Sequence, residues 1–115
     1  MHEYGIASSI VEALLEAAKE HGAVRVTGVE VRVGVLRGVV PEHLSFFYEH
    51  LARGTVLEGS ALNIVEVPVD ITCPGCGTFP WGEFTLSCPR CGESGIRVTG
   101  GDVLEVSSME VETEG

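Results

Sequence analysis

The residues with the clearest chemistry are four cysteines, and they form two matched pairs. The first pair is Cys73 and Cys76, the second is Cys88 and Cys91, and two residues separate the members of each pair. This spacing allows one tight turn to present both sulfur atoms to the same metal ion. Two such turns supply the four thiolates of a tetrahedral Zn²⁺ site. Because four thiolates close the coordination sphere, we expect this zinc to stabilise the fold and to leave no position for a substrate.

Two disulfides are the alternative use of the same cysteines. Disulfides are rare in reducing compartments, and a secretory signal would show a basic stretch followed by an apolar run. The chain instead opens with Met1-His2-Glu3-Tyr4 and has neither feature. The sequence therefore favours zinc over disulfides, and we expect the protein to be cytoplasmic.

The start of the chain gathers several nitrogen donors within two residues. The α-amine of Met1, the amide nitrogen of His2 and the imidazole of His2 could surround one ion in fused chelate rings. Glu3 could add an oxygen or a further amide nitrogen. Such a near-planar nitrogen set suits Ni²⁺ or Cu²⁺ better than Zn²⁺. Chain termini are, however, usually disordered unless something ties them down, and we expect no such tie before Ile6. These residues alone leave a frayed terminus and a metal site as alternatives.

Composition and charge exclude several classes of protein. The 115 residues include 7 basic and 17 acidic side chains, which gives a net charge of −10, and Lys19 is the only lysine. Nucleic acid binding needs a basic stripe, so we expect no nucleic acid partner. No apolar run approaches the roughly 18 residues of a membrane span, so we expect no membrane insertion. No nucleophile–base pair or phosphate-binding loop is visible, and the sequence does not indicate an enzyme.

Periodicity places these candidate sites on an α+β fold. Apolar residues at three- and four-residue spacing predict two helices, and alternating apolar residues predict three strands. We expect two helices packed on a three-stranded sheet, with a four-cysteine zinc-ribbon module inserted between the last two strands. The expected domains are an α/β domain at 1–70 plus 95–115 and a zinc-binding module at 71–94. The predicted elements are helices at 6–21 and from Pro41 to Gly54, and strands at 24–36, 61–69 and 102–112.

Aromatic residues occur at two informative places. Phe79 and Trp81 lie between the cysteine pairs. They could contact a partner, but they are better explained as a cover for the zinc site in a module that lacks a core of its own. Phe46, Phe47 and Tyr48 are consecutive and cannot all face the core, so we expect one of them to be exposed.

The chain resembles, over nearly its whole length, the hydrogenase-maturation nickel metallochaperone family, HypA/HybF. The resemblance rests on a set of short motifs that occur in order and at matching spacing, although none of them is specific alone. These motifs are Met1-His2-Glu3, the helix with Ile6, Ile10 and Leu14, Val26-Thr27 leading into Gly34, Val40-Pro41-Glu42-His43-Leu44, Gly54-Thr55, Glu58-Gly59-Ser60-Ala61-Leu62, the two cysteine pairs, Gly100-Gly101-Asp102 and Met109-Glu110-Val111-Glu112.

The resemblance implies a nickel metallochaperone with two metal sites. Ni²⁺ would bind at Met1, His2 and Glu3 in the α/β domain, and structural Zn²⁺ would bind at the four cysteines. With a partner GTPase of the HypB type, such a protein delivers nickel to the precursor of the [NiFe]-hydrogenase large subunit. Unlike many family members, the chain has no histidine from Ile71 to Gly115. Histidines of the zinc loop therefore cannot serve as nickel ligands here. The alternative is a zinc-ribbon adaptor that bridges proteins without carrying nickel.

Overall fold

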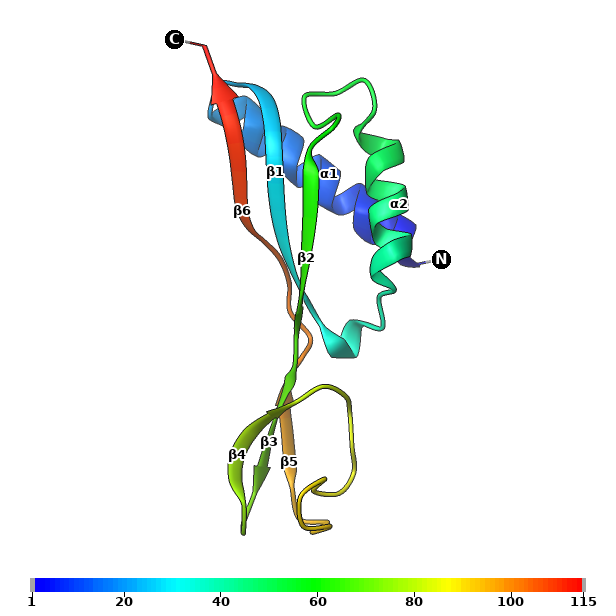
Figure 1. Cartoon of the computed structure of the whole chain (residues 1–115), viewed down its shortest axis with the longest axis vertical. Coiled ribbons are helices and arrows are strands. Elements are labelled where there is room, and N and C mark those ends of the chain that lie inside the picture. The colour runs from blue at the N-terminus through cyan, green and yellow to red at the C-terminus, as the bar shows by residue number, and fades with distance from the viewer. Residues whose placement is uncertain (1, 115) are drawn as a thin grey trace. The chain divides into compact units, whose positions relative to one another are not determined.

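The computed structural model describes residues 2–114, which form two α-helices, one short 3₁₀ helix and six strands (Figure 1). The strands make two three-stranded sheets, ordered β2-β1-β6 and β4-β3-β5. The expected fold class is confirmed, because the cysteine-bearing insertion lies between β2 and β6, the last two strands of the first sheet. In chain order the elements are α1 (His2–Glu20), β1 (Ala23–Gly34), η1 (Val35–Arg37), α2 (Pro41–Ala52), β2 (Ala61–Val67), β3 (Val69–Cys73), β4 (Gly77–Trp81), β5 (Arg97–Gly100) and β6 (Leu104–Thr113).

Tertiary contacts divide the chain into two compact units. The first, here called the helical unit, comprises the residues up to Val31, Val39–Val65 and the residues from Glu105 onward. The second, here called the cysteine unit, comprises Arg32–Gly38 and Glu66–Leu104. The cysteine unit thus contains the end of β1 and the 3₁₀ helix in addition to the segment that bears the cysteines.

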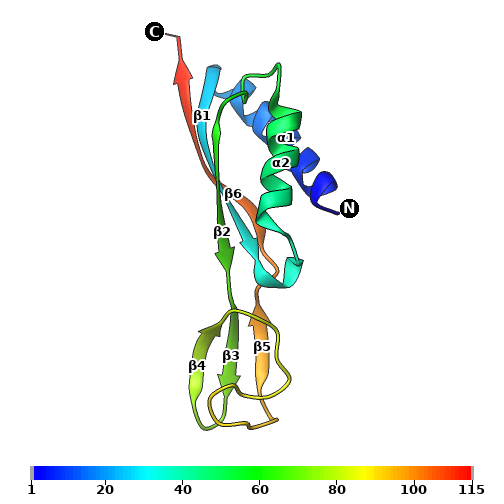
Figure 2. The ribbon, with the colours of Figure 1, turned by 45° about the vertical axis from the view of Figure 1, so that its right-hand side comes forward.

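The helical unit has an apolar core, formed where both helices cover the same face of the β2-β1-β6 sheet (Figure 2). Residues three or four positions apart share one face of a helix, so α1 buries the stripe that its sequence predicts. Each fully buried aliphatic side chain contributes about 1.5–3 kcal/mol to folding. Neither helix within residues 2–114 has the length and apolar character needed to cross a membrane. The buried residues of this core are Ala7, Ile10, Val11, Leu14, Ala18, Val26, Val29, Val31, Leu44, Tyr48, Ala52 and Leu57.

The three consecutive aromatic residues of α2 divide as expected between core and surface. Tyr48 is buried, whereas Phe46 is 67% exposed. Phe47 lies between two other rings, with its centroid 5.4 Å from that of Tyr4 and 5.4 Å from that of Phe46, both edge to face. The expectation that not all three face the core is confirmed.

The cysteine unit is built on a small antiparallel sheet. Its central strand, β3, pairs with β4 on one side and with β5 on the other. Alternate residues of β3 are buried, as the two-residue period of a strand requires. A core this small stabilises a fold only weakly without additional links. Its buried members are Val69, Ile71, Cys73, Phe79 and Cys88.

Two glycines are required where the end of β1 meets the segment that leads to β6. The N–H of Gly34 donates to the carbonyl oxygen of Val103, and the N–H of Leu36 donates to that of Gly101, each at 2.7 Å. A side chain on Gly34 would collide with the backbone of Gly101. Gly101 itself has a φ of +75°, which favours glycine, and a Cβ there would lie 2.5 Å from Cγ1 of Val69.

Several predicted boundaries differ from the structure. The strand predicted at 61–69 is in fact two strands of different sheets, β2 and β3, separated by Pro68, which has no N–H to continue the ladder. The short strand β5 was not predicted, and the last strand begins at Leu104. The second helix begins at Pro41 as expected, because proline is favoured in the first turn of a helix.

Candidate metal centres

The four cysteines come together from two segments of the cysteine unit. Cys73 is the last residue of β3 and Cys76 lies in the turn that leads to β4, while Cys88 and Cys91 lie between β4 and β5. The N–H of Gly92 donates to the carbonyl oxygen of Cys88 at 2.8 Å and closes the second turn. The glycine after each pair has a positive φ, +82° in the first turn and +81° in the second. Each pair is therefore held by a tight turn, as its spacing predicts.

The sulfur positions fit a tetrahedral zinc ion. All four Sγ atoms lie within 4.8 Å of one another. The Sγ atoms of Cys73 and Cys91 are 3.6 Å apart, and those of Cys76 and Cys88 are 3.9 Å apart. Around an ion with Zn–S bonds of about 2.3 Å, tetrahedral geometry places two sulfur atoms about 3.8 Å apart. Disulfide bonds would need about 2.05 Å, and the four cysteines are free, so the geometry fits zinc rather than disulfides.

In the folded site without a metal, the pKa values of the thiols differ from one cysteine to another. A hydrogen bond shared with Cys91, together with burial, raises the pKa of Cys76 to about 12. Burial also acts to raise the pKa of Cys88, but hydrogen bonds from the backbone N–H groups of Arg90 and Cys91 bring it down to about 7. Cys88 therefore forms a thiolate more readily than Cys76, and zinc must displace a proton from Cys76 when it binds.

Two aromatic rings cover the cysteine cluster, as the sequence predicts. Phe79 is buried in the same core as Cys73 and Cys88, and Trp81 packs against that core. The two rings meet edge to face, with their centroids 6.4 Å apart. The guanidinium carbon of Arg90 lies 4.0 Å from the centroid of the Phe79 ring, a cation–π contact. This contact holds the Arg90 side chain, which comes from the second cysteine turn, against the Phe79 ring.

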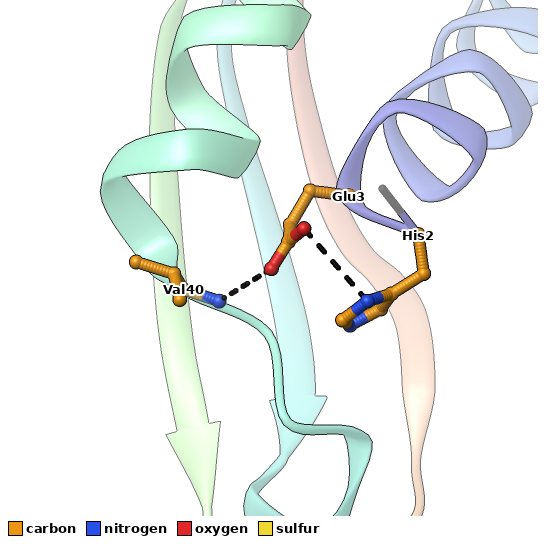
Figure 3. A network of polar contacts seen from close by, with 3 residues as sticks. All are labelled: His2, Glu3 and Val40. Atoms are coloured by element: carbon orange, nitrogen blue, oxygen red, sulfur yellow. Dashed lines mark hydrogen bonds and ion pairs between the residues drawn. The ribbon is translucent and has the colours of Figure 1, made fainter.

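The N-terminal residues are tied to the start of α2 (Figure 3). Helix α1 begins at His2 rather than at Ile6, so the expectation of a terminus with no tie before Ile6 is wrong. Oε2 of Glu3 accepts a hydrogen bond from the N–H of Val40 at 3.2 Å, and Oε1 of Glu3 lies 3.8 Å from Nδ1 of His2. Glu3 is only 6% exposed, whereas the side chain of His2 is 55% exposed. Met1, which the sequence also predicts as a nickel ligand, lies outside the described residues.

The carboxylate of Glu3 is held in its ionised form. The hydrogen bond from Val40 is the main cause of a lowered pKa of Glu3, and the nearby imidazoles of His2 and His43 act in the same direction. Val40 precedes Pro41 at the N-terminus of α2, where the helix dipole also favours a negative charge. At neutral pH the Glu3 side chain is therefore a carboxylate engaged with α2.

The other histidines do not join a cluster of metal ligands within the described part of the chain. His21, His43 and His50 are all exposed. Across residues 2–114, the four cysteines are the only group of three or more potential ligands close enough to share an ion. The sequence does not reveal the part played by Val40, because a backbone N–H gives no residue-type signal.

The fold and the cysteine cluster define a small α+β metal-binding protein with a four-cysteine centre. The family model described as hydrogenase/urease nickel incorporation, metallochaperone, hypA matches residues 1–111. The hydrogenase maturation factor HypA of Chlorobaculum tepidum is 40% identical over 97% of this chain and 100% of its own length. The factor of the same name from Geobacter metallireducens is 42% identical over the same shares of the two chains. The chain belongs to the HypA family of nickel metallochaperones.

Two solved structures share this fold. The solution structure of the Ni metallochaperone HypA from Helicobacter pylori matches with a TM-score of 0.65 and 23% identity, covering 97% of this chain and 98% of that one. A second solution structure of a HypA protein matches with a TM-score of 0.69 and 25% identity, covering 99% and 98%. Both matches extend over helices and sheets together and agree with the fold class expected from the sequence.

Proposed function

We propose that this protein carries nickel for hydrogenase maturation, with Ni²⁺ bound at its N-terminus. The ligands are the α-amine of Met1, the amide nitrogen and imidazole of His2, and the backbone nitrogen of Glu3. The observation that carries the proposal is the fixed position of the first helical turn, because Glu3 is buried and bonded to Val40 while the His2 side chain is exposed. A site held in place loses less conformational freedom on binding than a frayed terminus would.

The start of a helix is a suitable place for amide ligands. The first four N–H groups of an α-helix have no acceptor within the helix, and α1 begins at His2. The amide nitrogens of His2 and Glu3 can therefore lose their protons to nickel without breaking a helical hydrogen bond; at Glu3 the only bond given up is that of its N–H to its own carboxylate. Because these protons must leave, nickel affinity rises with pH. The Glu3 carboxylate, already engaged with Val40, supports the site and leaves ligation to the backbone.

The zinc ion of this proposal is a resident structural ion bound by Cys73, Cys76, Cys88 and Cys91. Support comes from the sulfur–sulfur separations of 3.6 and 3.9 Å and from the small core of the cysteine unit. Four thiolates leave no open coordination position. Zinc therefore holds the turn after β3 against the segment after β4, and nickel alone is the cargo.

The proposed recipient is the precursor of the [NiFe]-hydrogenase large subunit, and a GTPase of the HypB type assists the transfer in the cytoplasm. The description of the family model names nickel incorporation, and the relatives are named hydrogenase maturation factors. An exposed site at a chain end favours delivery, because the ion can pass to a partner without any opening of the core. The protein acts as a carrier and not as an enzyme. Its net charge of −10 suits a carrier of cations and does not suit nucleic acid binding.

Calorimetric titration of tag-free, zinc-loaded protein with Ni²⁺ tests the proposal. We expect one tight nickel site per chain, which is lost in His2→Ala and kept in His21→Ala, a matched change of an exposed histidine at the other end of α1. Equal binding by all three proteins would place the nickel site elsewhere. No binding by any of them would contradict nickel transport and favour the zinc-ribbon adaptor.

A further inference from the structure

β6 forms an outer edge of its sheet. In the sheet order β2-β1-β6, the described residues give β6 one neighbouring strand, β1, and none on its other side (Figure 1). The Thr27 hydroxyl donates to the Glu110 carbonyl, and the Ser107 hydroxyl donates to that of Glu30, so β6 runs antiparallel to β1. A strand at an edge directs half of its backbone N–H and C=O groups outward, where they can pair with one more strand.

A groove lies beside this edge on the helix-covered side of the sheet. It has a volume of about 460 Å³ and is lined by Ala17 of α1, by His21 directly after that helix, and by Met109, Val111 and Thr113 of β6. Most of this lining is aliphatic or thioether. Alternate side chains of a strand point to the same face, so those of an added strand that face the helices would enter this groove. Apolar side chains would thus be buried next to the backbone groups that pair.

The charge along β6 selects among the strands that could pair with it. From Asp102 to the end, the sequence has five acidic residues and no lysine or arginine. Glu110 and Glu112 are exposed, and Oε1 of Glu112 lies 3.9 Å from Nη1 of Arg25. A second copy of β6 would place like charges opposite one another, which destabilises a pair of strands, whereas opposite charges stabilise it. The edge therefore favours a basic strand over a second copy of itself.

We propose that the outer edge of β6 binds an extended basic segment of a partner protein by strand addition. Alternate residues of this segment are apolar and enter the groove at Met109 and Val111, and the lysines or arginines between them face Glu110 and Glu112. Backbone hydrogen bonds to the edge supply affinity, while the groove and the carboxylates supply specificity. This surface includes neither His2 nor the cysteines, so it can be tested separately from nickel transport.

A synthetic peptide of about ten residues that alternates lysine with valine is a suitable probe. Its binding to the full-length, zinc-loaded protein is measured by fluorescence anisotropy, and hydrogen–deuterium exchange locates the site. We expect slower amide exchange along β6, weaker binding as salt is raised, and no binding of a peptide with glutamate in place of lysine. No binding of the lysine–valine peptide, or protection that leaves β6 unchanged, would overturn the proposal.

Two charge-reversed variants distinguish peptide binding at the β6 edge from general attraction to an acidic protein. One is Glu110→Lys with Glu112→Lys, and the matched control is Glu12→Lys with Glu16→Lys on the exposed face of α1. Both raise the net charge equally. We expect at least about tenfold weaker peptide binding in the β6 variant than in the control. Equal weakening in both would mean non-specific attraction, and sedimentation of the wild-type protein as a dimer paired through β6 would mean that a second copy occupies the edge. Either result would refute strand addition by a basic partner.

Discussion

Replacement of Ile71 by alanine should sharply weaken the binding of zinc, although Ile71 is not a ligand. Ile71 is fully buried in the core that it shares with Cys73 and Cys88. Because so small a core does not keep the cysteine unit folded by itself, zinc binding and folding of this unit form one equilibrium. A loss of packing in the core must then appear as a loss of zinc affinity.

The size of the effect follows from the burial of Ile71. Truncation of a fully buried isoleucine to alanine costs about 2–5 kcal/mol, which includes the cavity that remains. A tenfold change in a dissociation constant corresponds to about 1.4 kcal/mol. The zinc dissociation constant of Ile71→Ala should therefore rise by at least about 30-fold, provided that the metal-free unit is unfolded in both proteins.

Competition with a coloured zinc chelator measures this constant on the full chain. Leu57→Ala is the matched control, because Leu57 is also fully buried but belongs to the helical unit. It should lower thermal stability and leave zinc affinity unchanged. Wild-type affinity in Ile71→Ala would mean that the cysteine unit folds before zinc binds, and would refute the coupling. An equal loss in both variants would mean that zinc affinity follows the stability of the whole chain and not that of one unit.

Three other predictions concern protons and hydrogen bonds. Zinc affinity should fall from about pH 8 to about pH 6, because the four thiols, whose ordinary pKa in an unfolded chain is about 8.5, must release protons when zinc binds; calorimetry in two buffers measures the release, and pH-independent binding would contradict it. The pKa of Glu3 is lowered from 4.5, so its stabilising effect is present above that pH and is lost as pH falls through the folded-state value. The fall in the free energy of unfolding at acid pH should therefore lack the contribution of Glu3 in Glu3→Gln and keep it in Glu12→Gln. Tyr48→Phe removes a 2.6 Å hydrogen bond to Ser60 and should lower the free energy of unfolding by about 1 kcal/mol, as measured by urea denaturation.

The cysteine site could be predicted because its chemistry is local in the sequence. Two intervening residues determine how Cys73 and Cys76 share a turn, and the same holds for Cys88 and Cys91, whatever the rest of the fold does. The apolar stripe of α1 is local in the same sense, because the helical period alone places its members on one face. Both features could therefore be recognised before any tertiary contact was known.

The tie at the N-terminus could not be predicted in this way. It joins Glu3 to Val40, 37 residues apart in the chain, and its donor is a backbone N–H that almost every residue possesses. The split between β2 and β3 was missed for another reason. Alternation of apolar residues continues through both strands, and the missing N–H of Pro68 was the one signal that the ladder stops there.

The pairing of β3 with β5 has a consequence for how chains of this kind can be recombined. Val69, at the start of β3, lies directly opposite Gly100, at the end of β5, and residues opposite each other in antiparallel strands have Cα atoms about 5 Å apart. The segment between them carries all four cysteines, and its two ends thus lie next to each other. Such a segment is a cassette: another metal-binding loop, or a two-residue hairpin turn, can replace it while β2 and β6 keep their places beside β1.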